Sequence, residues 1–330
     1  MATQTANRNL HAAKNARKDE FYTQLTDIEN ELRHYRHHFK NKVVYCNCDD
    51  PRVSNFFHYF SYNFEDLGLK KLITTCYQNQ NRDLFSKHDS KRALYLEYHG
   101  DTNQNRVPDI EEIGVQFLKG DGDFRSPESI ALLRQADIVV TNPPFSLFRE
   151  YVAQLIAYDK QFVIIGAYNA ITYKEIFPLI KENKMWLGYG FRSGNAYFKT
   201  PYYKEFAKGV YNEETGLVKF RNVTWYTNLD IAKRHEDLIL YKPYTPAEYP
   251  KYDNYDAINV DKTKEIPMDY KGAMGVPITF LDKYNPEQFE ILGCSYAYGR
   301  PEGWNNSIKM SGTINGKAIY KRLIIKNKRL

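Results

Sequence analysis

The sequence has 330 residues, of which 42% are hydrophobic, so it is long enough for one large domain or two domains of ordinary size. No stretch approaches the ~18 consecutive apolar residues of a membrane-spanning helix, and the polar, basic N-terminus lacks the apolar segment of a signal peptide. The net charge of +6 favours a nucleic-acid partner only modestly, because many solvated surfaces carry as much. Four cysteines are too few for a disulfide framework in this chain, so we expect a cytoplasmic protein.

From residue 28 to residue 184 the chain alternates between expected helices and expected strands. Helices are indicated by helical spacing, as in Ile28 and Leu32, and by the Ser126 cap with Pro127 at the first helical position. The expected helices are 26–42, 53–64, 126–136, 146–159 and 172–184. The expected strands are 42–48, 70–77, 115–119, 137–142 and 161–170, with a hairpin inserted around 103–105. This alternation is typical of an α/β protein with a parallel sheet and helices on both faces.

Beyond residue 190 the pattern changes to short strands and turns, and from about residue 236 the sequence is rich in Pro, Tyr, Asp and Lys. A basic, strand-like segment, "KAIYKRLIIKNKRL", closes the chain. We therefore expect an N-terminal α/β domain over residues 1–237 and a smaller, irregular domain over residues 238–330.

The most informative stretch is "DIVVTNPPFSLF", residues 137–148, where an apolar strand runs into Asn142, Pro143, Pro144 and Phe145. An exocyclic amine of a nucleobase is a poor nucleophile, since its lone pair is delocalised, so a site that methylates it must accept hydrogen bonds from it. The side-chain oxygen of Asn142 and the carbonyl of Pro143 supply two acceptors on a loop that two prolines stiffen. Phe145 offers a face to a base taken out of its stack. The alternative is a stiff strand exit with a packing phenylalanine, but the flanking strand and helix favour function.

Two more polar motifs fall at expected strand ends, "CNCDDP" at 46–51 and "KGDGDF" at 119–124. Ligands bind at the carboxyl ends of the strands in parallel α/β sheets, so we expect these motifs to share one crevice with Asn-Pro-Pro-Phe. The carboxylates of Asp121 and Asp123 suit an adenine amino group or ribose hydroxyls, and Phe124 can stack on adenine, although Gly-Asp turns are also common in ordinary loops. The Cys-x-Cys spacing has no second Cys or His pair nearby, so we expect no metal site.

The stretch "DEFYT", residues 19–23, precedes the first expected helix. Its aromatic residues and threonine could cap the methionine end of a bound cofactor. They could equally form a hydrophobic staple, with Thr23 or Asp27 as the helix cap.

The order of "DEFYT", "GDGDF" and "TNPPF", followed by a C-terminal domain, resembles the amino-group DNA methyltransferases of the gamma arrangement. The stretches "CNCDDPRVSNFF", "DIVVTNPPFSLF", "AITYKE", "KYDNYDAINV", "MGVPITFLDKYNPEQFEILG" and "IIKNK" resemble the EcoRI-type adenine-N6 DNA methyltransferases. The similarity covers about residues 15–330 and is weakest at 78–118, 190–222 and 294–312.

This resemblance implies a Rossmann-like sheet that binds S-adenosylmethionine and a C-terminal target-recognition domain. It implies site-specific methyl transfer to N6 of an adenine flipped out of duplex DNA, in a restriction-modification system or as an orphan or phage modification enzyme. The implied catalytic residues are Asn142, Pro143, Pro144 and Phe145. The implied cofactor contacts are Phe21, Tyr22, Thr23, Cys46, Asn47, Asp49, Asp50, Asp121, Asp123, Phe124 and Asn142.

Two features depart from the family's usual pattern. Cys-Asn-Cys-Asp-Asp-Pro replaces the usual glycine-rich first loop, and the second strand ends in Thr-Thr-Cys-Tyr without the acid that binds the cofactor ribose. Asp49, Asp50 or Glu97 could take the place of that acid.

We expect the enzyme to be monomeric. Its expected partners are double-stranded DNA and, in a restriction-modification system, a cognate restriction endonuclease. Basic residues of the N-terminal arm are candidates for phosphate contacts, unless they only keep the arm soluble. These residues are Arg8, Lys14, Arg17 and Lys18. The alternatives are a methyltransferase for RNA bases or protein glutamine, which can share Asn-Pro-Pro-aromatic, a nuclease, and a DNA-binding protein without catalysis. A non-catalytic binder would have little reason to keep both Asn142 and Asp123.

Overall fold

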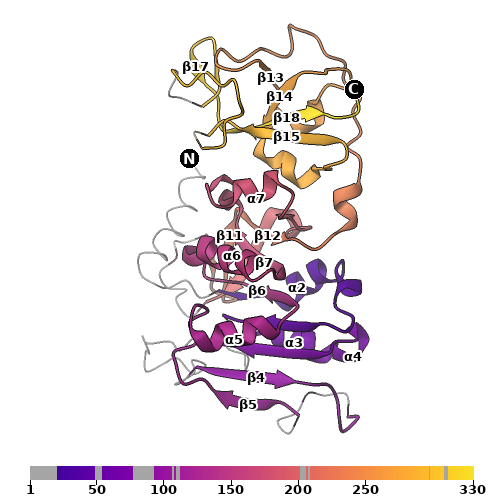
Figure 1. Cartoon of the computed structure of the whole chain (residues 1–330), viewed down its shortest axis with the longest axis vertical. Coiled ribbons are helices and arrows are strands. Elements are labelled where there is room, and N and C mark those ends of the chain that lie inside the picture. The colour runs from indigo at the N-terminus through magenta and orange to yellow at the C-terminus, as the bar shows by residue number, and fades with distance from the viewer. Residues whose placement is uncertain are drawn as a thin grey trace. The chain divides into compact units, whose positions relative to one another are not determined.

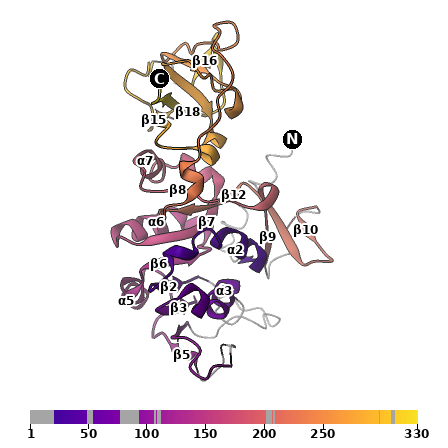
Figure 2. The same ribbon diagram turned by 90° about the vertical axis from the view of Figure 1, so that its right-hand side faces the viewer.

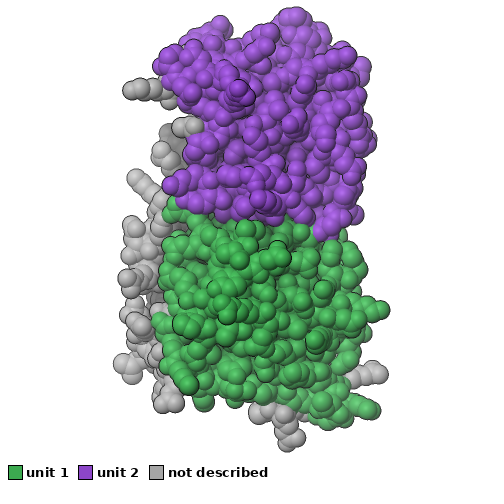
Figure 3. All heavy atoms as spheres, viewed as in Figure 1, with its two compact units in different colours: residues 1–169, 188–229 green, residues 170–187, 230–330 purple. Residues whose placement is uncertain are grey.

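The computed structural model describes residues 21–48, 54–76, 93–105, 108, 112–200, 206, 209–296, 298–307 and 311–330. The chain divides into two compact units, which Figure 3 shows in green and purple. Unit 1 comprises residues 1–169 and 188–229, and unit 2 comprises residues 170–187 and 230–330. The sequence-based boundary between residues 237 and 238 concerns functional domains, and it stays a prediction.

Unit 1 contains a large mixed sheet with strands in the order β5-β4-β3-β2-β6-β7-β12 (Figure 1). Their bounds are β2 Val43–Cys46, β3 Lys71–Thr75, β4 Leu94–Tyr98, β5 Gly114–Phe117, β6 Ile138–Thr141, β7 Gln161–Ala167 and β12 Val223–Thr227. The central strands β3, β2, β6 and β7 are parallel, whereas β4 and β12 run antiparallel to their neighbours. The expected α/β class is confirmed, but an entirely parallel sheet is wrong at both edges.

The central strands are parallel because their sequences allow burial on both faces. Every residue of β2 and β6 is buried, as expected for strands covered by helices on each side. In β4, buried and half-buried positions alternate, which is the pattern of an antiparallel strand near a sheet edge. Since β5 is antiparallel to β4, it points the same way as β3, and its carboxyl end lies on the same edge as those of β2 and β6.

Helices cover both faces of this sheet, with α5 and α6 on one side and α2 and α3 on the other in Figure 2. Their bounds are α2 Leu25–Leu32, α3 Asn55–Tyr62, α4 Phe64–Leu67, α5 Pro127–Gln135 and α6 Phe148–Ala157. The predicted cap of α5 is confirmed, because the Ser126 hydroxyl accepts a hydrogen bond from the Ser129 amide at 3.2 Å. The expected helix 26–42 is shorter, and after α2 only a 3-10 turn, Arg36–His38, remains of it.

A second, smaller sheet of unit 1 has the order β1-β9-β11-β10. The bounds are β1 Tyr22–Thr23, β9 Asn195–Lys199, β10 Tyr211–Asn212 and β11 Leu217–Arg221. Figure 2 shows β9 and β10 extending away from the central sheet. In β1, Tyr22 pairs with Lys199 and Thr23 with Phe198, so the "DEFYT" segment is held by strands from a distant part of the chain.

Unit 2 contains a four-stranded sheet in the order β13-β14-β18-β15 and a small hairpin, β16–β17. The bounds are α7 Phe177–Lys181, β8 Trp186–Leu187, β13 Ala257–Asn259, β14 Ala273–Pro277, β15 Phe289–Cys294, β16 Thr313–Ile314, β17 Lys317–Ala318 and β18 Arg322–Asn327. The expected basic strand at the end of the chain is β18, which pairs with two neighbours. In the described ranges, no helix combines the length and apolar character that a membrane span requires.

Candidate active site

The Asn-Pro-Pro-Phe loop follows β6 directly at the carboxyl edge of the central sheet. Asn142 is only 7% exposed, and its Nδ2 donates a hydrogen bond to the backbone carbonyl of Phe21 at 2.6 Å. Its Oδ1 is buried and accepts no hydrogen bond from the residues that the structure describes. A buried acceptor without a donor is costly, so this oxygen fits a hydrogen-bond donor that a ligand would bring.

The carbonyl of Phe21 also decides the orientation of the Asn142 amide. A carbonyl oxygen can only accept, so the amide nitrogen must face Phe21 and the amide oxygen must face away. The acceptor that the proposed chemistry needs is therefore fixed by a backbone group of the "DEFYT" segment.

Phe145 and Phe21 belong to an aromatic cluster above this loop. Their rings stack at 5.8 Å between centroids with an interplanar angle of 25°, and Phe220 meets Phe21 edge-on at 4.8 Å. The cluster consists of Phe21, Phe145, Phe198, Phe206 and Phe220. Phe145 itself is half-buried, so part of its ring is open to a ligand.

Thr23 is held in β1 rather than at a helix cap. Asn55, the first residue of α3, donates from Nδ2 to the Thr23 carbonyl at 2.7 Å. The N-cap of α2 is Gln24 and no side chain caps it, so the alternative role of Thr23 or Asp27 as a cap is wrong. The Thr23 hydroxyl is also buried and has no hydrogen-bond partner among the described residues.

The "KGDGDF" motif follows β5 and forms a tight turn. The carboxylate of Asp123 accepts hydrogen bonds from the Arg125 amide, Nε and Nη2 at 2.8, 2.9 and 2.7 Å. These bonds hold the pKa of Asp123 below its usual value. Arg125 in turn pairs with Glu150 at 2.8 Å, so Asp123 must exchange or share these bonds if it binds a ligand.

Phe124 and Asn47 are linked through Tyr151 of α6. The ring of Phe124 meets Tyr151 edge-on at 5.1 Å, and the Tyr151 hydroxyl donates to Oδ1 of Asn47. The Thr141 hydroxyl donates to the backbone carbonyl of Asn47. The structure therefore brings the loop after β2, the end of β6 and the "KGDGDF" turn together.

Several predicted site residues lie elsewhere or cannot be placed. Glu97, one alternative for the ribose-binding acid, lies on β4 and pairs with Lys71 at 2.9 Å. The ranges of the described structure contain no group of three or more His, Cys, Asp or Glu that could hold a metal ion. The predicted residues outside the described ranges are Asp49, Asp50, Arg8, Lys14, Arg17 and Lys18.

Three contributors to the site carry no motif. Asn55 follows a serine at a helix start and looks like a capping residue, and Tyr151 lies within an ordinary amphipathic helix. Phe198 lies in "NAYFK", where alternating buried and exposed positions predict a strand but not its partner. Only the long-range contacts of these residues show that they belong to the site.

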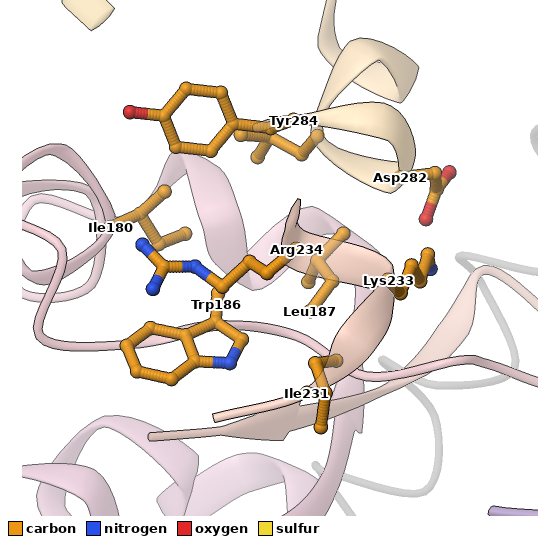
Figure 4. Close-up of a pocket in the computed structure, with 9 residues that line it drawn as sticks. Ile180, Trp186, Leu187, Ile231, Lys233, Arg234, Asp282 and Tyr284 are labelled. Atoms are coloured by element: carbon orange, nitrogen blue, oxygen red, sulfur yellow. The ribbon is translucent and has the colours of Figure 1, made fainter. Parts of the chain in front are cut away.

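Unit 2 has a small pocket of its own, which Figure 4 shows. Its interior is occupied by the guanidinium of Arg234, which lies 3.8 Å from the centre of the Trp186 ring. Arg234 also donates to Asn183 at 2.6 Å. The pocket is therefore filled by the protein itself and is no candidate for the active site.

A mixed α/β sheet with an Asn-Pro-Pro-Phe loop after a central strand, and a buried amide oxygen without a donor among the described residues, is the arrangement expected of an amino-group methyltransferase. A family model described as "Adenine-specific methyltransferase EcoRI" matches residues 9–328. The chain belongs to this family, so it is a DNA adenine methyltransferase, an enzyme class that in general takes its methyl group from S-adenosylmethionine.

Three relatives match over nearly their whole length. The Type II methyltransferase M.EcoRI of Escherichia coli is 54% identical over 100% of this chain and 99% of its own. The Type II methyltransferase M.MgeORF184P of Mycoplasma genitalium is 38% identical over 97% of this chain and 99% of its own. The Type II methyltransferase M.MpnI of Mycoplasma pneumoniae is 36% identical over 97% and 98%, respectively. No solved structure shows a significant match to the chain.

Proposed function

We propose that the chain methylates N6 of an adenine flipped out of duplex DNA at a specific sequence. The observation that carries this proposal is the buried Oδ1 of Asn142, which lacks a donor and is oriented by the Phe21 carbonyl. A Rossmann-like cofactor-binding sheet in unit 1 and a target-recognition domain over residues 238–330 complete the proposal.

In this mechanism Asn142 Oδ1 and the Pro143 carbonyl accept hydrogen bonds from the adenine amino group. These bonds favour a pyramidal nitrogen whose lone pair is available, and the prolines keep both acceptors in place. The open part of the Phe145 ring supports the flipped base. When bound, S-adenosylmethionine would supply a methyl group from its sulfonium sulfur, and the amino nitrogen would gain this group and lose one proton to solvent.

The described residues offer the cofactor a buried polar atom that has no hydrogen-bond partner among them, the Thr23 hydroxyl. The Thr23 hydroxyl is buried and orphaned, which suits the amino or carboxylate group of the methionine part. Asp123 suits the adenine or ribose part, once Arg125 shares its carboxylate. The proposed cofactor contacts are Phe21, Tyr22, Thr23, Cys46, Asn47, Asp49, Asp50, Asp121, Asp123, Phe124 and Asn142.

The proposal also covers the partners. We expect the enzyme to act as a monomer on double-stranded DNA, with the N-terminal arm contacting phosphates. The high identity to a Type II methyltransferase supports a place in a restriction-modification system, in which a cognate restriction endonuclease would be the second component.

Asn142→Ala tests the mechanism. It should lower the rate of methyl transfer to duplex DNA by at least about 10²-fold, while the affinity for S-adenosylmethionine, measured by calorimetry, stays within a few-fold of the wild type. The matched control is Asn30→Ala, which truncates a half-buried asparagine of α2 and should keep full activity. Wild-type activity of Asn142→Ala, or modified-base sequencing that finds methylation on a base other than adenine, would overturn the proposal.

A further inference from the structure

Two exposed arginines of unit 1, Arg192 and Arg221, differ from the other arginines that the structure describes. We call them the rim arginines, and neither has a hydrogen bond, ion pair or ring contact with another described residue. The other described arginines each have an interaction within the protein. They are Arg33, Arg36, Arg125, Arg134, Arg149, Arg234, Arg300, Arg322 and Arg329. Some described lysines, such as Lys264, also form no ion pair, so the position of the rim arginines has to carry the argument.

Arg221 lies at the carboxyl edge of the central sheet, the edge that also carries Asn142. It ends β11, and β12 begins two residues later at Val223. Val223 pairs with Ala167, the last residue of β7, and β7 is parallel to β6, the strand that Asn142 follows. Neighbouring strands lie about 4.8 Å apart, so β12 is two spacings, roughly 10 Å, from β6.

The aromatic cluster links Arg221 to Asn142 by a second route. Phe220, the neighbour of Arg221, meets the Phe21 ring edge-on at 4.8 Å. Phe21 also stacks on Phe145 at 5.8 Å, and its carbonyl accepts the hydrogen bond from Asn142. Successive residues of a strand point to opposite faces, and Phe220 is buried whereas Arg221 is exposed. Arg221 therefore lies at the outer margin of the cluster, open to solvent.

The segment 188–191 runs beside β12 and brings Arg192 to the same margin. The Gly188 amide donates to the Trp225 carbonyl at 2.9 Å, and a Cβ at Gly190 would lie 3.9 Å from the Thr224 hydroxyl. The segment advances as β12 is followed backwards, so the two are antiparallel. Arg192, two residues beyond Gly190, is therefore placed beside the start of β12.

A short turn joins Arg192 to β9. The amide of Gly194 donates to the Phe191 carbonyl at 3.0 Å, which closes the 3-10 turn Arg192–Gly194. The next residue, Asn195, pairs with Arg221 in the register of β9 and β11. Both rim arginines thus lie at the same end of the small sheet.

Helix α2 fixes the backbone that leads to Arg192. Glu31 of α2 is fully buried and accepts hydrogen bonds from the amides of Tyr189 and Gly190 at 2.8 and 2.9 Å. The ring of His34 stacks on Tyr189 at 3.5 Å between centroids. The backbone is held by α2 before Arg192 and by β9 after it, so the arginine has a defined place although its side chain is exposed.

We propose that the rim arginines bind the backbone phosphates next to the flipped adenine. A nucleotide that leaves the duplex rotates about its own backbone, so its phosphates lie at the margin of the site that receives the base. A guanidinium binds a phosphate through two parallel hydrogen bonds, and an anion between two like charges offsets their repulsion. This inference rests on the proposed function and assigns residues to its DNA contact.

The test measures binding of the full-length protein to a duplex that contains its methylation site, between about 50 and 200 mM salt. Arg192→Gln/Arg221→Gln should weaken binding about tenfold or more and reduce the salt slope by about one for each arginine. The matched control is Arg134→Gln, an exposed arginine of α5, whose last turn leads into the opposite, amino end of β6. It should leave affinity and slope nearly unchanged.

A second measurement identifies the phosphates. Methylphosphonates, which carry no charge, replace the two phosphates next to the target adenine. This replacement should weaken wild-type binding about as much as the arginine substitutions do, but it should weaken Arg192→Gln/Arg221→Gln by less than about twofold, because the two changes remove the same contacts. An equal loss in both proteins would show that the rim arginines bind other phosphates, which contradicts the proposal.

Wild-type affinity and salt slope in Arg192→Gln/Arg221→Gln would overturn the proposal, and so would an equal loss in Arg134→Gln, since net charge alone would then explain the effect. Both rim arginines are exposed, so thermal unfolding should be unchanged. Arg192→Lys/Arg221→Lys keeps the charge and should keep the wild-type slope; a reduced slope in this variant would also contradict the proposal.

Modified-base sequencing of DNA methylated by the wild type locates the target adenine and reports separately on the proposed function. A wild type that methylates adenine, together with unaffected binding in Arg192→Gln/Arg221→Gln, would reject the role of the rim arginines alone.

Discussion

At Asn142, a single backbone carbonyl decides which end of the amide acts as the acceptor. The asparagine, the prolines and the aromatic ring can be recognised from their order in the sequence, because strand, stiff loop and helix are contiguous. The orienting carbonyl of Phe21 lies 121 residues away, and no local pattern links the two. The position of the loop at the end of a strand was therefore predictable at the residue scale, whereas the carbonyl that orients the Asn142 amide was not.

Asp123 and Arg125 offer a prediction at the same scale. Arg125 holds the pKa of Asp123 below its usual value, so the pair stabilises the fold fully above the unfolded-state pKa of about 3.9 and loses this effect as pH falls through the lower folded pKa. Arg125→Ala should therefore lower the free energy of unfolding at neutral pH, by less than about 1 kcal/mol because Arg125 is half exposed and screened by solvent. The difference from the wild type should shrink below about pH 4.

Urea unfolding of both proteins at several pH values measures this difference. Arg134→Ala, on the exposed face of α5, is the control and should give no difference that depends on pH in this way. A difference between Arg125→Ala and wild type that grows as the pH falls would contradict the assignment.

The elements that could be predicted are those whose pattern is local. The buried strands β2, β6 and β7 contain continuous apolar runs, and the serine cap and first-turn proline mark α5. The expected helix 172–184 is reduced to α7 because Pro178 lies in the first turn, where a proline starts a helix rather than continuing one. The two-residue strand β1 could not be predicted, since it forms by pairing with β9, which lies far along the chain.

Asn55 provides a prediction about the placement of β1. Its hydrogen bond to the Thr23 carbonyl anchors the segment whose Phe21 carbonyl orients Asn142. Asn55→Ala should lower the single-turnover rate of methylation up to about tenfold, since a hydrogen bond contributes about 0.5–1.5 kcal/mol and 1.4 kcal/mol is a factor of ten in rate. DNA binding should not change.

Asn63 is a close match for a control. It lies at the other end of α3, and its Nδ2 donates to the Tyr59 carbonyl at 2.8 Å, so Asn63→Ala removes the same type of bond away from the site. Both variants should lose similar thermal stability, but only Asn55→Ala should slow methyl transfer at saturating substrates. Equal rates in the two variants would show that Asn55 has only a structural role.

Over the whole molecule, the chain enters unit 2 at residue 170, returns to unit 1 at residue 188 and leaves again after residue 229. The returning segment contributes β12 to the central sheet and the β9–β11 strands that hold β1. The sequence changes in composition and pattern near residue 190, but no local pattern shows that residues 188–229 belong to unit 1. Within unit 2, Arg329 donates to Asp237 at 2.8 Å, so the last residues of the chain lie beside the beginning of the segment 230–330.

Because the predicted cofactor contacts come from distant parts of unit 1, we expect cofactor binding to stabilise unit 1 as a whole. Phe21, Asn47, Phe124 and Asn142 come together only in the folded unit, so a ligand that needs them binds no unfolded chain. S-adenosylhomocysteine, the product of methyl transfer, at 100 times its Kd should then raise the free energy of unfolding by about 2.7 kcal/mol. Calorimetry with and without this ligand measures the corresponding rise in Tm.

Thr23→Val makes this prediction sharper, because its two effects have opposite signs. Without ligand, valine removes a buried hydroxyl that has no partner among the described residues, so the Tm should rise or stay equal. With ligand, the same change removes a hydrogen bond to the methionine part, so the ligand-induced rise in Tm should become smaller. If Thr23→Val keeps the full ligand-induced rise, the Thr23 hydroxyl does not bind the cofactor and its burial must have another cause.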